Sequence, residues 1–145
     1  MVVANGNGCQ LCFTFANRPK TAFSHFFSTH PLIHSSRIPV SLEITPTELK
    51  ARLDKGEPLQ IIDVREDMEW EFCNIGGLHI PLADLPKNLS KVPAQVPVVL
   101  VCHHGVRSGQ ALRYLSSVTG QTNFLNLKGG IHAWALQVDP EMPQY

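Results

Sequence analysis

One short stretch, Cys102 to Ser108, holds the residues whose types and spacing could do chemistry. The cysteine follows the four apolar residues 98–101, a pattern typical of a strand buried on both of its faces. Residues 109–115 place alanine and leucine at helical spacing and predict a helix. A thiol between such a strand and helix lies at the carboxyl edge of a sheet, beside the positive end of the helix. We therefore expect Cys102 to form a reactive thiolate.

The other loop residues suit substrate binding around this sulfur. Gly105 permits the backbone angles that direct successive N–H groups toward a thiolate. Arg107 adds a permanent positive charge at the rim, suited to an oxyanion such as thiosulfate or to a charged sulfur adduct. Ser108 would either cap the helix or donate a hydrogen bond to the sulfur. His103 and His104 are interpreted as outward-facing mouth residues or solvated loop residues, because a loop that stabilises a thiolate needs no general base. The predicted loop consists of Cys102, His103, His104, Gly105, Val106, Arg107 and Ser108.

A second pair of charged residues, Asp63 and Arg65, comes at the end of another apolar run, residues 59–64. The carboxyl ends of neighbouring parallel strands meet at one edge of a sheet, and ligands bind at that edge. We therefore expect this carboxylate and guanidinium to lie near Cys102 and to contribute to substrate binding.

Helices and strands alternate along the chain. Thr45, Pro46 and Glu48 predict a capped helix start, and Gly56 predicts its left-handed end. This order predicts an α/β fold with a central parallel sheet and helices on both faces. Further strands are predicted at 59–64, 78–82, 98–101 and 122–127, and helices or helical turns at 66–72, 84–89, 109–115 and 131–136.

Composition excludes several functional classes. The chain has 145 residues, 43% of them hydrophobic and 17% charged, which fits one globular domain that we expect to be monomeric. No apolar run reaches the roughly 18 residues of a membrane span. All twelve acidic residues lie from Glu43 onward, together with nine of the twelve basic ones. A net-acidic domain without a basic cluster argues against nucleic acid as a partner.

Residues 1–42 differ from the domain predicted at 43–145. They contain no acidic residue and are rich in serine and threonine, which is typical of a mitochondrial or plastid transit peptide. A disordered leader, or upstream sequence that is not translated, remains the alternative. The expected location is the matrix or stroma if the leader is a transit peptide, and the cytoplasm if the protein is bacterial.

Three further cysteines accompany Cys102. Cys9 and Cys12 form a C-x-x-C pair. No second ligand pair with zinc spacing follows it, so this pair alone does not predict a zinc site. Cys73 is interpreted as a buried structural thiol, with a resolving role toward Cys102 as the alternative. Nothing in this pattern requires a disulfide framework, so a reducing compartment is expected.

The loop from Cys102 to Ser108 resembles the active-site loop of the rhodanese family of sulfurtransferases. The resemblance extends from about Ile44 to Tyr145, and one departure is Asn74, where the family more often has histidine. The ending is similar to that of stand-alone rhodaneses and of those fused to sulfur-carrier-activating enzymes. The other segments that carry the resemblance are 62–66 with its Asp-x-Arg motif, 74–82, 127–134 with its Gly-Gly-x-x-x-Trp motif, and 139–145.

This resemblance implies a rhodanese fold and a two-step sulfur transfer. Cys102 would take a sulfane sulfur from a small donor such as thiosulfate or a persulfide. The resulting Cys102 persulfide would then pass the sulfur to a thiol, to cyanide or to a protein acceptor such as a sulfur carrier. No metal and no organic cofactor is expected.

Three alternatives stay open. A phosphatase or arsenate reductase would use a related loop, but with five residues between cysteine and arginine, and here four separate Cys102 from Arg107. The shorter loop favours a single sulfur atom over a phosphate group. A persulfide relay to another protein, or a non-catalytic rhodanese module that docks a partner or senses redox state, would also fit the sequence.

Overall fold

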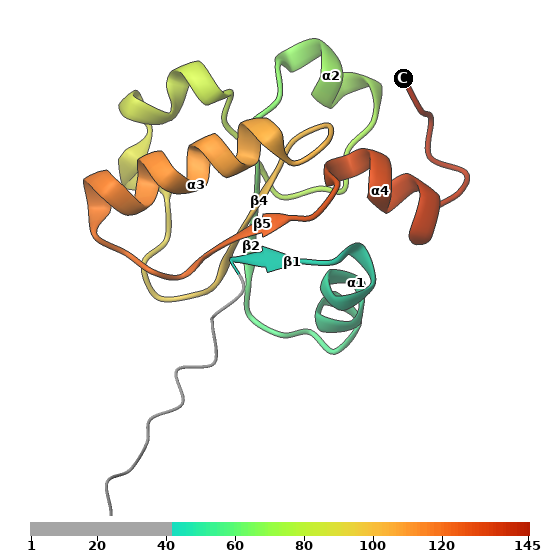
Figure 1. Cartoon of the computed structure of the whole chain (residues 1–145), viewed down its shortest axis with the longest axis horizontal. Helices are drawn as coiled ribbons and strands as arrows, with labels where there is room; N and C mark the ends of the chain where they lie inside the picture. Colours follow the sequence, from blue (N-terminus) through green and yellow to red (C-terminus); the bar gives the residue numbers. More distant parts are fainter. Residues whose placement is uncertain (1–41) are drawn as a thin grey trace, which may run out of the picture. The chain divides into compact units, whose positions relative to one another are not determined.

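A five-stranded parallel sheet forms the centre of the part of the chain that this computed structural model describes, residues 42–145 (Figure 1). Its order is β1-β5-β4-β2-β3, and every neighbouring pair is parallel. The predicted leader and the pair Cys9 and Cys12 lie outside the described residues. The strands are β1 (Glu43–Ile44), β2 (Gln60–Asp63), β3 (Leu78–His79), β4 (Val98–Val101) and β5 (Phe124–Leu127).

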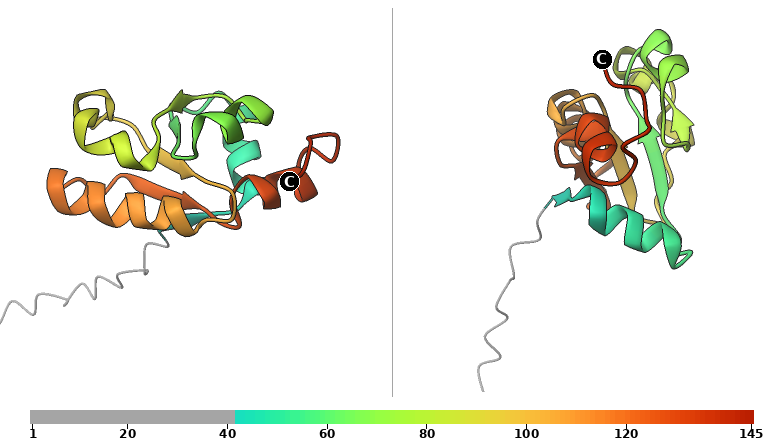
Figure 2. Two further views of the ribbon diagram at one scale, coloured as in Figure 1. Left: turned by 90° about the horizontal axis from the view of Figure 1, so that it is seen from above. Right: turned by 90° about the vertical axis from the view of Figure 1, so that its right-hand side faces the viewer.

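Helices cover both faces of this sheet, as the sequence predicts (Figure 2). One face carries α3 (Val106–Thr119) and the 3₁₀ helices η1 (Leu82–Lys87) and η2 (Leu89–Lys91). The opposite face carries α1 (Pro46–Asp54) and α4 (Gly130–Gln137), while α2 (Asp67–Phe72) follows β2. None of the described helices combines the length and apolar character that crossing a membrane requires.

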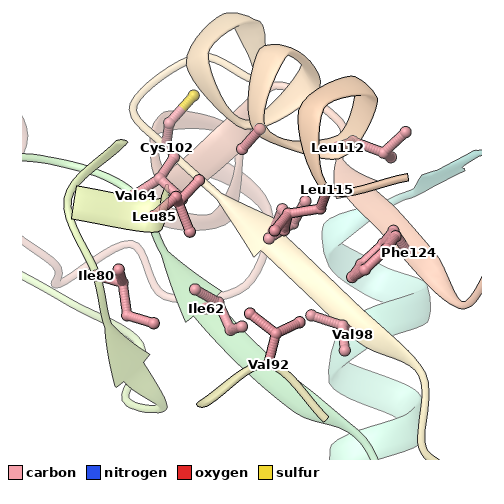
Figure 3. Packing of buried hydrophobic residues seen from close by; sticks show 12 residues of the cluster. Ile62, Val64, Ile80, Leu85, Val92, Val98, Cys102, Leu112, Leu115 and Phe124 are labelled. Carbon is pink, nitrogen blue, oxygen red and sulfur yellow. The ribbon is translucent and has the colours of Figure 1, made fainter. Parts of the chain in front are cut away.

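A hydrophobic core lies on each face of the sheet. Strand β4 contributes to both cores because its side chains alternate between the two faces. Val98 and Leu100 pack toward α3, whereas Val99 and Val101 pack toward α1 and α4. All four are fully buried, which explains the continuous apolar run in the sequence. Cys102 follows at one end of the α3-side core, and its sulfur points away from the other cluster residues (Figure 3).

Helix α1 begins as predicted. Thr45 precedes it, the Glu48 N–H donates to the Thr45 hydroxyl at 3.2 Å, and the Thr45 N–H donates to the Glu48 carboxylate at 2.9 Å. These reciprocal bonds satisfy two backbone donors that have no partner inside the helix. Gly56 follows the helix with a φ of +65°, in the left-handed region expected of it.

Three elements differ most from the prediction. Residues Glu43–Ile44 form the edge strand β1 beside β5, a pairing too short to leave a periodic pattern. Strand β3 ends at His79, before Pro81. Helix α3 begins at Val106, three residues earlier than predicted, because the left-handed Gly105 turns the chain directly into it. Ser108 therefore lies inside the first turn, and its expected role as the helix cap is wrong.

Candidate active site

Cys102 lies between the end of β4 and the start of α3, and only 1% of its surface is exposed. The Gly105 N–H donates a hydrogen bond to its sulfur at 3.1 Å, and the Ser108 hydroxyl lies at hydrogen-bond distance, 3.2 Å. Among the described residues, one backbone donor thus reaches the sulfur, where several were expected. The Ser108 hydroxyl supplies the second donor near the sulfur.

Two glycines allow the loop to pack closely against its neighbours. Gly105 has a φ of +93°, and a side-chain carbon there would lie 3.3 Å from the Leu127 carbonyl oxygen. At Gly130, with a φ of +62°, the same carbon would lie 2.3 Å from the carbonyl oxygens of Cys102 and His103. Only glycine fits where α4 meets the loop, which explains the Gly-Gly pair before this helix.

The first turn of α4 donates hydrogen bonds to the loop backbone. The Ile131 N–H bonds the Cys102 carbonyl at 2.9 Å, and the His132 N–H bonds the His103 carbonyl at 3.1 Å. These are helix-end donors that have no partner within α4. These two backbone hydrogen bonds therefore fix the loop at Cys102 and at the residue that follows it.

Asn126, on β5, supports the loop and was missed by sequence reasoning. Its side-chain N–H donates to the Gly105 carbonyl at 3.1 Å, and its side-chain oxygen accepts from the Ser108 hydroxyl at 2.6 Å. Because a hydroxyl has one hydrogen, Asn126 and the Cys102 sulfur share the same donor. The signal in the sequence was an amide in an otherwise apolar strand, residues 124–127.

Arg107 is not a free cation at the rim, which corrects the expectation from the sequence. Its two terminal nitrogens donate to the two carboxylate oxygens of Glu69, each at 2.6 Å. The hydrogen bonds from Arg107 lower the pKa of Glu69 to about 2, and the same contact raises the pKa of Arg107. The loop is thus joined to α2 by a two-pronged ion pair.

Asp63 and Arg65 were predicted to contribute to substrate binding, and the structure buries both of them completely. A terminal nitrogen of Arg65 lies 2.7 Å from a carboxylate oxygen of Asp63. Arg65 also donates to the backbone carbonyls of Cys73 at 2.7 Å and of Glu69 at 3.1 Å. The pair therefore ties β2 to α2 and positions the helix that carries Glu69.

The last residue, Tyr145, returns to the same region, where it lies beside α2 (Figure 1). Its hydroxyl accepts from Arg65 at 2.9 Å and donates to Glu69 at 3.0 Å. Its ring stacks on His103 with centroids 4.2 Å apart and meets Phe72 edge-on at 5.5 Å. The end of the chain is thus part of the loop's surroundings, which no local pattern in the sequence indicated.

His103 and His104 stack on each other, with ring centroids 3.9 Å apart. His104 is exposed, as a mouth residue should be, whereas His103 is half-buried beside Tyr145. Burial lowers the pKa of His103, and the neighbouring His104 adds to this effect. A third histidine, His132 on α4, lies with its ring 5.1 Å from that of His104 and was not among the predicted site residues.

A comparison with known protein families gives a match over most of the described residues. The family model of the "Rhodanese-like domain" matches residues 45–137. The chain belongs to the rhodanese-like domain family. The resemblance found in the sequence is confirmed, and so is the predicted fold.

This rhodanese-like domain is similar to parts of larger proteins. It is 40% identical over 105 residues to the probable adenylyltransferase/sulfurtransferase MoeZ of Mycobacterium tuberculosis, covering 70% of this chain and 26% of that protein. It is 33% identical over 116 residues to the adenylyltransferase and sulfurtransferase MOCS3-1 of Zea mays, covering 74% and 25%. The chain therefore spans about a quarter of the length of the curated relatives it matches.

A solved structure of similar size also matches. The rhodanese-like domain protein of Staphylococcus aureus superposes with a TM-score of 0.59 and 36% identity, covering 63% of this chain and 89% of that one. The sheet and its flanking helices are thus shared with a relative that consists almost entirely of this domain.

Cys73 packs on the other side of the sheet from Cys102 in this rhodanese-like domain. It is 8% exposed and packs in the core beneath α1 and α4, whereas Cys102 belongs to the core beneath α3. Both thiols are free. This placement favours the structural interpretation of Cys73 over a resolving role.

Proposed function

We propose that this rhodanese-like domain is a sulfurtransferase that carries a sulfane sulfur on Cys102. The observation that carries the proposal is the Cys102 sulfur itself, held at the carboxyl edge of the sheet by the Gly105 N–H at 3.1 Å and the Ser108 hydroxyl at 3.2 Å. The relatives named as sulfurtransferases support the same chemistry.

The transfer takes two steps. The Cys102 thiolate attacks the outer sulfur of a donor such as thiosulfate or a persulfide, and forms a new S–S bond. The donor's own S–S bond breaks, and its electron pair leaves with sulfite or with the donor thiolate. The thiolate of an acceptor, or cyanide, then attacks the outer sulfur of the Cys102 persulfide and releases the Cys102 thiolate.

A backbone N–H group and the dipole of helix α3 stabilise the negative charge on the Cys102 sulfur during transfer. The Gly105 N–H is fixed by the left-handed loop and the contacts of Asn126, so it needs no reorganisation as charge returns to the sulfur. The N-terminus of the 14-residue helix α3 adds its positive end to the same position.

A protein acceptor, or a persulfide relay to one, fits the surface beside the loop. Met68 and Phe72 on α2 and Val106 on the loop are exposed by 83%, 53% and 69%. An apolar hollow of about 260 Å³ on α2 is lined by Met68, Glu69, Phe72 and Tyr145. Exposed apolar side chains around a reactive group are typical of a protein-binding surface.

The donor preference follows from the pairing of Arg107 with Glu69. Thiosulfate carries two negative charges, and the guanidinium that would bind it already holds a carboxylate. This pairing favours a persulfide donor over thiosulfate. It also argues against a phosphatase, which needs several donors and a free arginine around its phosphate group.

Steady-state kinetics test the proposal. With thiosulfate or an alkyl persulfide as donor and cyanide as acceptor, we expect parallel double-reciprocal lines, which indicate a covalent intermediate. Cys102→Ser should abolish turnover, and the matched variant Cys73→Ser should retain it. Turnover that survives in Cys102→Ser would contradict the proposal, and hydrolysis of an aryl phosphate in its place would point to the phosphatase.

A further inference from the structure

Three histidines from two separate elements converge at the mouth of the loop. His103 and His104 follow Cys102, and His132 lies in the first turn of α4. Each offers one ring nitrogen, and the three nitrogens all lie within 4.8 Å of one another. Neutral imidazole is a favoured ligand of zinc, copper and nickel ions.

The backbone holds this cluster together. The His132 N–H donates to the His103 carbonyl at 3.1 Å, and Gly130 lets α4 approach the loop at a distance that no other residue permits. The spacing between His132 and His103 is therefore set by the same contacts that position Cys102.

One ring nitrogen of His132 has no hydrogen-bond partner among the described residues. The His132 Nδ1 atom is buried, and no described residue forms a hydrogen bond with it. Buried polar atoms in folded proteins nearly always have a partner, so an unpaired one indicates a ligand or an ordered water. On the same loop, the positive charge of Arg107 is offset by Glu69, which lowers the repulsion toward a bound cation.

The rings need a modest adjustment to bind one ion. Zinc–nitrogen bonds of about 2.0–2.1 Å place two ligand nitrogens of a tetrahedral site about 3.3 Å apart. The planes of the stacked His103 and His104 rings are inclined by only 28°, and the lone pair of an imidazole nitrogen lies in its ring plane, so one ring must tilt for both nitrogens to meet at one ion. A turn of the exposed His104 ring about its side-chain bonds would make them converge.

We propose that His103, His104 and His132 bind one divalent transition-metal ion, such as Zn²⁺, Ni²⁺ or Cu²⁺, at the mouth of the loop. Three protein ligands leave one coordination position open to water or to an incoming sulfur ligand. The pattern is invisible in the sequence, because the third histidine lies on a different element from the other two.

Metal titration of the full chain, prepared without a histidine tag, tests the site. Zn²⁺ binding is measured by calorimetry, and Co²⁺ serves as the spectroscopic probe. His132→Gln and His104→Gln should each lose one bound ion per chain, or bind it at least about tenfold more weakly. His79→Gln is the matched control, because His79 contacts Trp70 and the Arg65 carbonyl and is not in the cluster.

Two results would contradict the proposed metal site. One is Zn²⁺ binding that is equal in the wild type and in both cluster variants. The other is a cobalt spectrum with thiolate charge-transfer bands that disappears entirely in the variant Cys9→Ser/Cys12→Ser, which would assign the ion to the C-x-x-C pair. Near-ultraviolet circular dichroism verifies that each variant is folded. Since the readout is metal binding, the outcome does not depend on sulfurtransferase activity.

Discussion

Glu69 accepts two hydrogen bonds of 2.6 Å from Arg107, so the arginine of the loop that follows Cys102 is neutralised by a carboxylate from α2. The contact joins two segments that are distant in sequence. In the proposed function it would set the charge that an incoming sulfur donor meets. The loop sequence alone gives no sign of this carboxylate.

Removing this carboxylate should improve the use of anionic donors. In Glu69→Gln the positive charge of Arg107 is no longer offset, and we expect the KM for thiosulfate to fall about three- to fivefold, the scale of one partly exposed ion pair. The KM for an uncharged alkyl persulfide should stay unchanged and serves as the control. An unchanged or higher KM for thiosulfate would show that Arg107 does not face the donor.

The Glu69–Arg107 ion pair makes the free energy of unfolding depend on pH in the acid range. The pKa of Glu69 is lowered to about 2 in the folded protein, chiefly by the hydrogen bonds from Arg107, against an ordinary value of 4.5. A lowered carboxylate pKa stabilises the fold above the unfolded-state value, and this stabilisation is lost as the pH falls from about 4.5 toward about 2. We expect a loss of about 1–2 kcal/mol in the free energy of unfolding, after solvent screening.

Urea denaturation at several pH values over this window measures that loss. Glu69→Gln should show a smaller decline than the wild type, because its side chain does not titrate. Equal declines in the two proteins would mean that another group is responsible.

Asn126 and Ser108 should act as one unit on the sulfur. The Ser108 hydroxyl lies 2.6 Å from the Asn126 side-chain oxygen and 3.2 Å from Cys102. We expect Asn126→Ala and Ser108→Ala each to slow formation of the Cys102 persulfide about tenfold, and the double variant to be little worse than either. Stopped-flow loading with a persulfide donor measures these rates. Rates that multiply in the double variant would indicate that the two residues act independently.

The buried Asp63–Arg65 pair should affect stability. Asp63→Asn leaves the Arg65 guanidinium without a counter-ion in a fully buried position, which we expect to cost about 3–5 kcal/mol in the free energy of unfolding. Denaturant unfolding measures this, with Asp54→Asn, which removes the exposed partner of Lys50, as the control. If Asp63→Asn raised only the KM for the donor and left stability intact, the original substrate-binding interpretation would be restored.

Much of this site was predictable from local pattern. The apolar run before Cys102 predicts the strand, Gly105 predicts the tight loop, and the helical spacing of the residues beyond predicts the helix. All three signals are local, because each element depends on residues that are neighbours in the sequence. The capping box of Thr45 and Glu48 and the left-handed Gly56 are equally local. The sheet could be predicted because alternating strands and helices leave few other arrangements.

The missed contacts are tertiary. Glu69, Asn126, His132 and Tyr145 reach the loop from α2, β5, α4 and the end of the chain, and no spacing in the sequence records that they meet. The buried contacts of Arg65 could not be predicted for the same reason. In the sequence, a charged residue at a strand end is typical of a ligand-binding group. In the structure, Arg65 is buried against the Asp63 carboxylate and the backbone carbonyls of Glu69 and Cys73.

The central claim is that Cys102 carries the transferred sulfur, and intact-protein mass spectrometry tests it most directly. After incubation with thiosulfate or an alkyl persulfide and removal of the donor, the wild type and Cys73→Ser should each gain the mass of one sulfur atom, and peptide mapping should place it on Cys102. Subsequent cyanide, or a thiol acceptor, should remove it. A wild-type protein that gains no sulfur from either donor, or a Cys102→Ser variant that gains as much as the wild type, would contradict the account.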